Sequence, residues 1–249
     1  MWFESLVSSA RTGKLSNARR LSLNDCLFRA RALWPQSCQL CGAECRGSAL
    51  CAPCTAELPW LPRQRCAVCA VPLTSGRVCG ACLESPPRYD GVEAALAYRF
   101  PVDALIQAYK YGGRLALASP LGEILAQAVT RDVDVIVPTP LAPGRLAQRG
   151  FNQALELARA VAARTGMPLL RNACRKVTDT PPQAALPWKA RARNVRRAFV
   201  CDADVRGKRV AVVDDVLTTS ATLNELARVL RRAGAVEVVG WVVARALPR

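Results

Sequence analysis

The 249-residue sequence contains no histidine, so the side chain that most often acts as a general acid or base near neutral pH is missing. Aromatic residues make up only 6% of the chain, which leaves few side chains for stacking on nucleobases. No apolar run approaches 18 residues, and residues 1–33 contain no apolar segment of the length that a signal peptide needs. We therefore expect a soluble, cytoplasmic protein without membrane insertion.

Lysine is also scarce. Five of the 35 basic residues are lysines, so 30 are arginines, a bias that codon composition alone can produce. The net charge of +16 is therefore weak support for a nucleic-acid partner. Residues 171–209 nevertheless hold eleven basic and three acidic residues. This local excess is compatible with contact to nucleic acid and equally with contact to a pyrophosphate group, and both interpretations stay open.

Length and composition divide the chain into one domain of ordinary size and a small module. Residues 1–33 form a basic N-terminal extension. Residues 34–88 contain most of the cysteines, and the linker after them, Leu83-Glu-Ser-Pro-Pro-Arg88, has two prolines that resist helix and central strand. The larger domain is predicted over residues 89–249.

Eight of the twelve cysteines form two blocks of identical Cys-x2-Cys-x9-Cys-x2-Cys spacing, offset by 28 residues. In a reducing compartment such pairs are metal ligands rather than disulfide halves, and four pairs in a regular repeat argue against a redox motif. The pattern predicts two structural zinc ions, whose binding energy stabilises a segment too small for its own core. Sequential and cross-braced pairing both remain open. The predicted ligands are Cys38, Cys41, Cys51, Cys54, Cys66, Cys69, Cys79 and Cys82.

Hydrophobic periodicity beyond residue 89 alternates between short apolar runs and helical patterns, which predicts an α/β fold with a largely parallel sheet. The predicted strands are 91–100, 133–137, 195–200, 209–213 and 236–244. The predicted helices are 102–109, 119–130, a segment through Arg164 that Gly166 stops, and a segment ending at Gly234. Residues 138–145, with three prolines, are predicted to form a stiff loop, and residues 171–197 are expected to be disordered or a lid.

The strand at Val210–Val213 leads into an acidic pair and then a turn rich in hydroxyl groups at a helix start. Asp214 and Asp215 stand where open α/β sheets bind ligands, and Thr222 with Glu225 has the spacing of a capping box. A helix N-terminus beside hydroxyl groups suits a phosphate, while nearby carboxylates suit sugar hydroxyls or a metal-bound sugar. The stretch predicts a sugar-phosphate site that includes Thr218, Thr219, Ser220, Ala221 and Thr222.

This stretch resembles the signature of type I phosphoribosyltransferases, except that Ser220 stands where that family usually has glycine. The resemblance implies that Asp214 and Asp215 bind the ribose hydroxyls of phosphoribosyl pyrophosphate with Mg²⁺, while the loop cradles the 5-phosphate. It also implies a phosphoribosyltransferase fold for residues 89–249.

Further motifs narrow the resemblance to the ComF family. They are Lys110-Tyr111, the run Arg149-Gly-Phe-Asn-Gln153, and Gln183-x7-Arg191-x2-Asn194-Val195, all behind the cysteine pairs. The resemblance implies that Arg149, Lys110 and Arg191 neutralise the pyrophosphate. It also implies a role in natural competence, with single-stranded DNA and competence or helicase proteins as partners. An active transferase and a phosphoribosyl pyrophosphate sensor remain alternatives.

Overall fold

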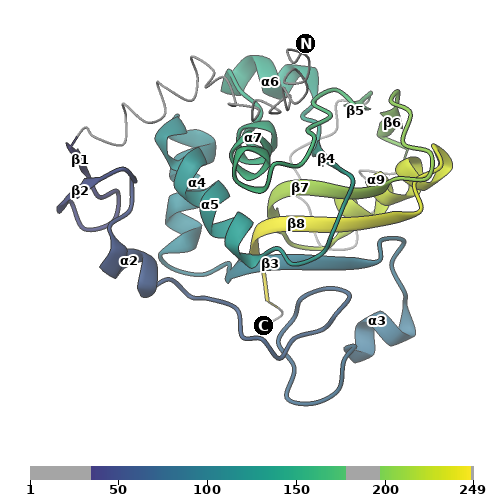
Figure 1. The fold of residues 1–249 in the computed structure, drawn as a ribbon, viewed down its shortest axis with the longest axis horizontal. Coiled ribbons are helices and arrows are strands. Elements are labelled where there is room, and N and C mark those ends of the chain that lie inside the picture. The colour runs from purple at the N-terminus through teal and green to yellow at the C-terminus, as the bar shows by residue number, and fades with distance from the viewer. Residues whose placement is uncertain (1–34, 178–196, 248–249) are drawn as a thin grey trace, which may run out of the picture.

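A parallel sheet in the order β3-β8-β7-β4 forms the centre of the computed structural model, which describes residues 35–177 and 197–247 (Figure 1). Each of the three strand pairs is parallel, so all four carboxyl ends lie along one edge of the sheet. The α/β class with a parallel sheet is thereby confirmed. The strands are β3 (Gly91–Ala97), β4 (Val135–Pro138), β7 (Arg209–Leu217) and β8 (Glu237–Arg245).

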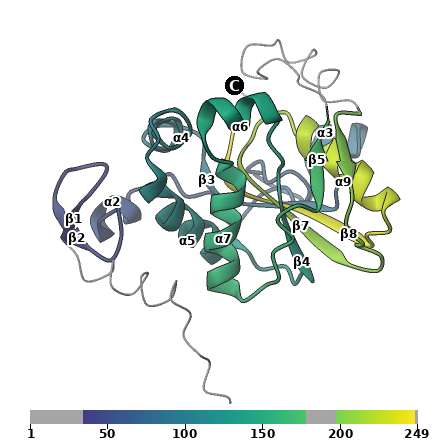
Figure 2. The ribbon, with the colours of Figure 1, turned by 90° about the horizontal axis from the view of Figure 1, so that it is seen from above.

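Helices cover both faces of the sheet, which is why the strands read as continuous apolar runs (Figures 1 and 2). The helices α4, α5 and α7 pack on one face, and α9 packs on the other. Gly122 of α5 lies so close to α7 that an added Cβ would be 2.4 Å from the Cβ of Ala160. The helices are α4 (Val102–Tyr111), α5 (Ala118–Ala128, after the 3-10 turn η1, Leu115–Leu117), α7 (Gln153–Thr165) and α9 (Ala221–Arg232).

Three elements differ from the sequence prediction. The three-proline segment is not wholly a loop, because Pro143 starts the helix α6 (Pro143–Arg149), where its missing N–H costs nothing. Strand β7 does not stop at Val213, since its pairing with β8 continues to Leu217. The predicted strand 195–200 is observed, in its described part, as β6 (Phe199–Cys201), which pairs antiparallel with β5 (Cys174–Lys176), a strand that was not predicted. Residues 178–196 of the predicted lid, and residues 1–34, lie outside the described chain.

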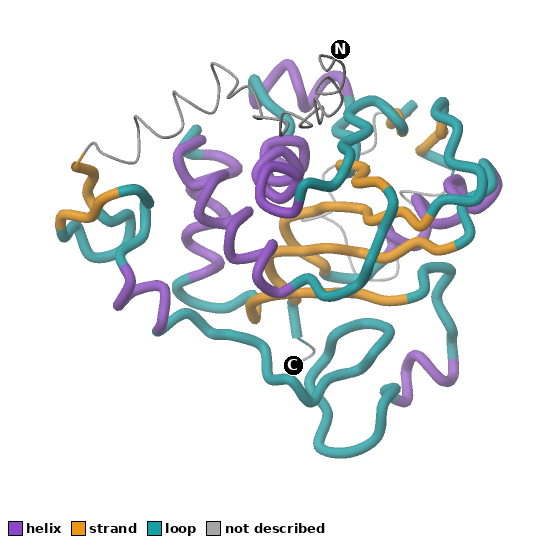
Figure 3. Tube along the Cα trace, in the orientation of Figure 1, coloured by secondary structure: helices purple, strands orange, loops and turns teal. Residues whose placement is uncertain are grey.

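The cysteine-rich segment folds mostly as loops, with the short elements β1 (Pro35–Ser37), β2 (Glu44–Arg46), α2 (Ala52–Ala56) and α3 (Gly80–Glu84) (Figure 3). Its middle part runs along the outer edge of the sheet. There Leu61 N donates to Ala95 O at 3.0 Å, and Ala97 N donates to Pro59 O at 2.8 Å. These bonds cover the free edge of β3. Within the described ranges no helix combines the length and apolarity needed to cross a bilayer.

Candidate functional site

A pocket of about 510 Å³ opens beyond the carboxyl ends of β4, β7 and β8. This is the edge at which open α/β sheets bind ligands. The structure brings together in it every described non-cysteine residue that the sequence predicted for the site, whereas Arg191 lies outside the described residues. Their roles toward a ligand remain predictions. These residues are Lys110, Arg149, Asp214, Asp215, Thr218, Thr219, Ser220, Ala221 and Thr222.

The turn from β7 into α9 has a left-handed residue at the N-cap of the helix, a conformation that glycine adopts without strain. Ser220 is the N-cap and adopts φ 61°, a left-handed conformation that costs free energy for a residue with a side chain. The predicted capping box is wrong, because this N-cap comes two residues before Thr222. Glu225 instead accepts hydrogen bonds from the Arg228 guanidinium at 3.0 and 2.7 Å. Residues Ala221, Thr222 and Leu223 of the first turn of α9 line the pocket, and Ala221 N donates to Thr219 Oγ1 at 3.4 Å. A helix N-terminus at a pocket wall suits an anion.

The two acidic residues occupy different environments, because consecutive residues of a strand point to opposite faces. Asp215 is buried, with 3% of its surface exposed. Its Oδ1 accepts a bond from Val216 N at 2.7 Å, and its Oδ2 lies 2.9 Å from the Lys110 Nζ. Desolvation lowers the pKa of Lys110, but the Asp215 carboxylate outweighs it and leaves that pKa above its usual value. Asp215 therefore holds Lys110 as a cation at the pocket wall.

Asp214 is the more open of the two carboxyl groups. It is half-buried, and its Oδ1 accepts a bond from Asp215 N at 2.8 Å. Burial and the charge of Asp215 raise the pKa of Asp214 to about 7, although Lys110 opposes the shift. The pocket thus contains a carboxyl group that changes protonation near neutral pH. The sequence showed two equivalent acids and gave no sign of this difference.

The run from Arg149 to Gln153 contributes its two end residues to the lining of the pocket. Gly150 ends α6 in the left-handed region, at φ 79°. Asn152 caps α7 by accepting backbone N–H bonds at 3.0 and 3.4 Å, and its Nδ2 donates to Thr139 O at 3.1 Å. Gln153, only 8% exposed, accepts a bond from Arg149 Nη1 at 2.5 Å. The motif therefore fixes the guanidinium of Arg149 at the pocket.

Several further residues line the pocket besides the predicted site residues. The Tyr111 ring lies beneath the Arg149 guanidinium, whose central carbon is 5.1 Å from the ring centroid. Lys176 and Phe199 reach the pocket from the β5–β6 hairpin. A strand of three residues carries almost no periodic signal, so β5 and its pairing with β6 could not be predicted from the sequence pattern. Arg145, from the first turns of α6, also lines the pocket.

The eight repeat cysteines form two compact groups away from this pocket. Within each group the sulfur atoms all lie within 4.8 Å of one another, and the grouping is sequential rather than cross-braced. Burial raises the pKa values of Cys38 and Cys66, but backbone N–H donors outweigh it and lower them to about 6 and about 7. Four converging sulfurs in each group, one of which has a lowered pKa, fit structural zinc. The groups are Cys38, Cys41, Cys51, Cys54 and Cys66, Cys69, Cys79, Cys82.

Comparison with known proteins agrees with this architecture. Residues 30–83 match the double zinc ribbon domain. Similar solved structures include a glutamine phosphoribosylpyrophosphate amidotransferase from B. subtilis, which is 26% identical with a TM-score of 0.38 over 54% of this chain and 30% of that one. A purine phosphoribosyltransferase from Pyrococcus horikoshii is 21% identical with a TM-score of 0.28 over 62% and 78%. The chain therefore combines an α/β domain built on a parallel sheet with an N-terminal segment that matches the double zinc ribbon domain.

Similar proteins of known name cover most of the chain and define its family. Competence protein F of Haemophilus influenzae is 33% identical over 81% of this chain and 95% of its own length. DNA utilization protein YhgH of Escherichia coli K12 is 32% identical over 73% and 84%. Competence protein ComFC of Streptococcus pneumoniae is 25% identical over 80% and 88%. The chain belongs to the competence protein F family.

The tetracysteine groups predict a metal content that can be measured directly. We expect two zinc ions per chain in protein purified without chelator, by elemental analysis. Replacing Cys51 and Cys54 with serine should leave one ion, and so should replacing Cys79 and Cys82, because each group forms its own site. Loss of both ions after either double substitution would show that the sites are not independent, and iron in their place would contradict the zinc assignment.

The buried ion pair predicts a large loss of stability when only one partner is removed. Lys110→Met should lower the free energy of unfolding by about 3–5 kcal/mol, because Asp215 would stay buried without its cation. Lys110→Met with Asp215→Asn should recover much of that loss, as urea-induced unfolding would measure. Arg206→Met, which removes an exposed pair with Asp204, should change little. Equal destabilisation by the single and double changes would contradict the pairing argument.

Proposed function

We propose that the pocket binds phosphoribosyl pyrophosphate together with Mg²⁺. One observation carries the proposal. The helix N-terminus of α9, the cations Lys110 and Arg149, and the partly open carboxyl group of Asp214 all line a single pocket. A phosphate at one end, ribose hydroxyls in the middle and a pyrophosphate at the other end would complement these groups in turn.

Each group has a role that follows from its surroundings. The hydroxyl and N–H groups of residues 218–222 would hold the 5-phosphate, and Asp214 would accept hydrogen bonds from the ribose hydroxyls. Asp215, engaged by Lys110, would act mainly by keeping that cation in place. Arg149 would face the pyrophosphate. Mg²⁺ prefers substrate phosphates with few carboxylates, and Asp214 is the carboxyl group open enough to contribute.

This proposal predicts pH-dependent binding. Because the pKa of Asp214 is raised to about 7, the group is mostly protonated at pH 6 and mostly ionised at pH 8. Affinity for phosphoribosyl pyrophosphate with Mg²⁺ should rise across this range and then level off, since an ionised carboxylate binds the metal and the hydroxyls better. Calorimetric titration of the parent and of Asp214→Asn should show that the variant binds more weakly and has lost this rise.

Two further variants complete the calorimetric test. Thr219→Ala should weaken binding by about 1–3 kcal/mol through loss of a charge-assisted hydrogen bond to the phosphate. Asp132→Asn, an exposed carboxyl group before β4 at the opposite edge of the sheet, should bind as the parent does. Unchanged affinity after Asp214→Asn combined with Asp215→Asn would place the ligand elsewhere.

Turnover is a second candidate, and the position of Asp214 favours it. A carboxyl group with a pKa of about 7 is suited to proton transfer, in a chain that has no histidine. A nucleophile would displace pyrophosphate from C1 of the ribose, with the pocket cations neutralising the leaving group. Pyrophosphate release with a panel of bases would distinguish a transferase from a protein that only binds or senses the ligand.

We further propose that the protein handles single-stranded DNA together with competence or helicase proteins. Family membership supports this, since the relatives are named for competence and DNA utilization. The basic stretch 171–209 supports it only in part. In its described portion Arg175, Arg206 and Arg209 already pair with Asp202, Asp204 and Asp134, respectively. The basic residues between 189 and 197 are then the better candidates for DNA phosphates.

The DNA proposal predicts a specific salt dependence. Binding to oligo-dT should weaken steeply with salt, and replacing Arg191, Arg193, Arg196 and Arg197 with glutamine should reduce the slope by about one for each DNA phosphate that the protein no longer neutralises. Arg175→Gln should leave the slope unchanged, because that guanidinium already pairs with Asp202. If the quadruple variant keeps the parent slope but loses affinity for phosphoribosyl pyrophosphate, the cluster serves the pocket instead.

A further inference from the structure

One buried side chain joins the second zinc ribbon to the phosphate turn. Here the second ribbon means residues 66–82, and the phosphate turn means residues 217–222. Arg245 ends β8 and is 6% exposed. Its Nε donates to Cys69 O at 2.8 Å, while its Nη1 donates to Leu217 O at 3.0 Å and to Thr218 O at 2.8 Å. A zinc ligand's own carbonyl and the first carbonyls of the turn therefore share one guanidinium.

The charge of Arg245 makes its hydrogen bonds energetically important as well as structural. Among the described residues it forms no ion pair, and its guanidinium donates to backbone carbonyl oxygens, including Ala246 O at 2.5 Å. A buried cation needs its hydrogen bonds to be complete, because an unsatisfied charged group is costly. Its positive charge lies against the carbonyl oxygens of Leu217 and Thr218, shortly before the N-cap Ser220. There it adds to the positive electrostatic potential of the α9 N-terminus.

Two residues that follow the second ribbon also lie beside α9. Tyr89, 5% exposed, belongs to the same buried cluster as Ala70 of the second ribbon, and Ala221 of α9 packs against this cluster. Arg88 N donates to Asn224 Oδ1 at 2.5 Å in the first turn of α9. A left-handed serine persists only where its surroundings hold it in place. Arg88 and Tyr89, which follow the second ribbon, contribute to those surroundings.

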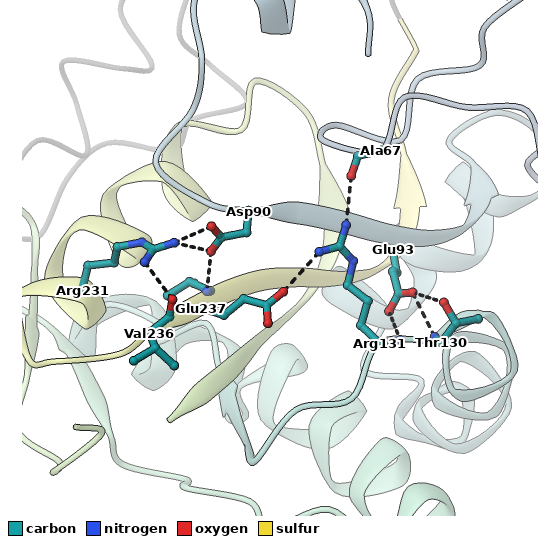
Figure 4. Close-up of polar contacts among 9 residues, drawn as sticks. Ala67, Asp90, Glu93, Thr130, Arg131, Arg231, Val236 and Glu237 are labelled. Atoms are coloured by element: carbon teal, nitrogen blue, oxygen red, sulfur yellow. Dashed lines mark hydrogen bonds and ion pairs between the residues drawn. The ribbon is translucent and has the colours of Figure 1, made fainter. Parts of the chain in front are cut away.

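The segment from Cys66 to Cys69, here called the knuckle, is also bound by a second arginine. Arg131 Nη2 donates to Ala67 O at 3.3 Å, and its Nη1 lies 3.2 Å from Glu237 Oε1 (Figure 4). Figure 4 shows this guanidinium beside β3, between the knuckle and the start of β8. The carbonyls of Ala67 and Cys69 are thus both tied to the sheet. A displacement of the knuckle would therefore change the hydrogen bond from Arg245 Nε to Cys69 O.

The first ribbon (residues 38–54) has the same ligand spacing but a different neighbourhood. Its Leu50 packs in the core cluster that contains α4 and α5 residues. Its Gln39 Oε1 accepts a bond from Arg114 Nη1 at 3.0 Å. No hydrogen bond among the described residues joins it to the phosphate turn. The chain therefore carries its own control for any effect of zinc on the turn.

We propose that Arg245 is a positioning residue through which zinc in the second ribbon holds the phosphate turn in its anion-binding shape. Without the metal, the knuckle that presents Cys69 O loses its four-sulfur constraint, so Arg245 loses a partner and the carbonyls of Leu217 and Thr218 lose their anchor. The ligand of the turn is the one in the proposed function, and the inference rests on that function only for the ligand's identity.

Amide hydrogen exchange tests the coupling without any ligand. Exchange of the peptide covering residues 217–222 is compared in the parent, in Cys79→Ser with Cys82→Ser, and in Cys51→Ser with Cys54→Ser, with α7 as the internal reference. Zinc content is measured for each. The second-ribbon variant should exchange about tenfold faster in the turn, as expected for the loss of one buried hydrogen bond. The first-ribbon variant should match the parent there.

Arg245→Met decides whether the coupling passes through this side chain. It should keep two zinc ions and exchange faster in the turn, and adding the second-ribbon substitutions to it should give little further increase. Additive effects would overturn the proposal, as would equal effects of the two ribbons. Arg245→Lys keeps the charge but not the fork of donors, so its exchange rate in the turn should exceed that of the parent. This milder variant replaces Arg245→Met in the comparison if Arg245→Met folds poorly.

Calorimetry with phosphoribosyl pyrophosphate and Mg²⁺ then separates this inference from the proposed function. If the parent binds, the second-ribbon variant and Arg245→Met should bind at least several-fold more weakly, and the first-ribbon variant should bind as the parent does. If the parent does not bind, the proposed function fails while the exchange data still decide the coupling. If the parent binds and the second-ribbon variant binds equally well, the coupling is contradicted.

Discussion

The pairing of β7 with β8 is the constraint on which the site depends. The ladder runs in one register from Arg209 opposite Glu237 to Leu217 opposite Arg245. It carries the acidic pair to the pocket edge and places Arg245 directly beside the start of the phosphate turn. Because the side-chain period of a strand is two, a slip of one residue would exchange the surroundings of Asp214 and Asp215 and bury the wrong carboxyl group. The alternation of buried and open carboxyl groups follows from this register.

The acidic pair shows how neighbours in sequence acquire different chemistry. Asp215 is engaged by Lys110, and this ion pair fixes a cation at the pocket wall. The charge of Asp215 then acts on Asp214, which is held near its point of titration. The two residues form one electrostatic unit with Lys110. The protonation state of Asp214 therefore depends on both Asp215 and Lys110.

The sequence allowed much of the fold to be predicted, and the reasons are local. The apolar runs of β3, β4, β7 and β8, the glycines that stop helices and the cysteine spacing all act over a few residues. The candidate ligand residues were also readable, since motif residues gather at strand ends. What could not be predicted depends on distant partners. Neither the short strand β5 with its pairing to β6 nor the link from Arg245 to Cys69, separated by 176 residues, leaves a local pattern.

The strip of chain between the two ribbons, which pairs with β3 through Pro59 and Leu61, has a consequence for how the parts can be separated. A fragment that began at Tyr89 would contain every strand of the α/β sheet, but the apolar edge strand β3 would be left without its hydrogen-bonding partner. Such edges recruit foreign strands and lead to aggregation. We therefore expect the fragment from Tyr89 onward to aggregate when it is produced without the zinc-ribbon segment.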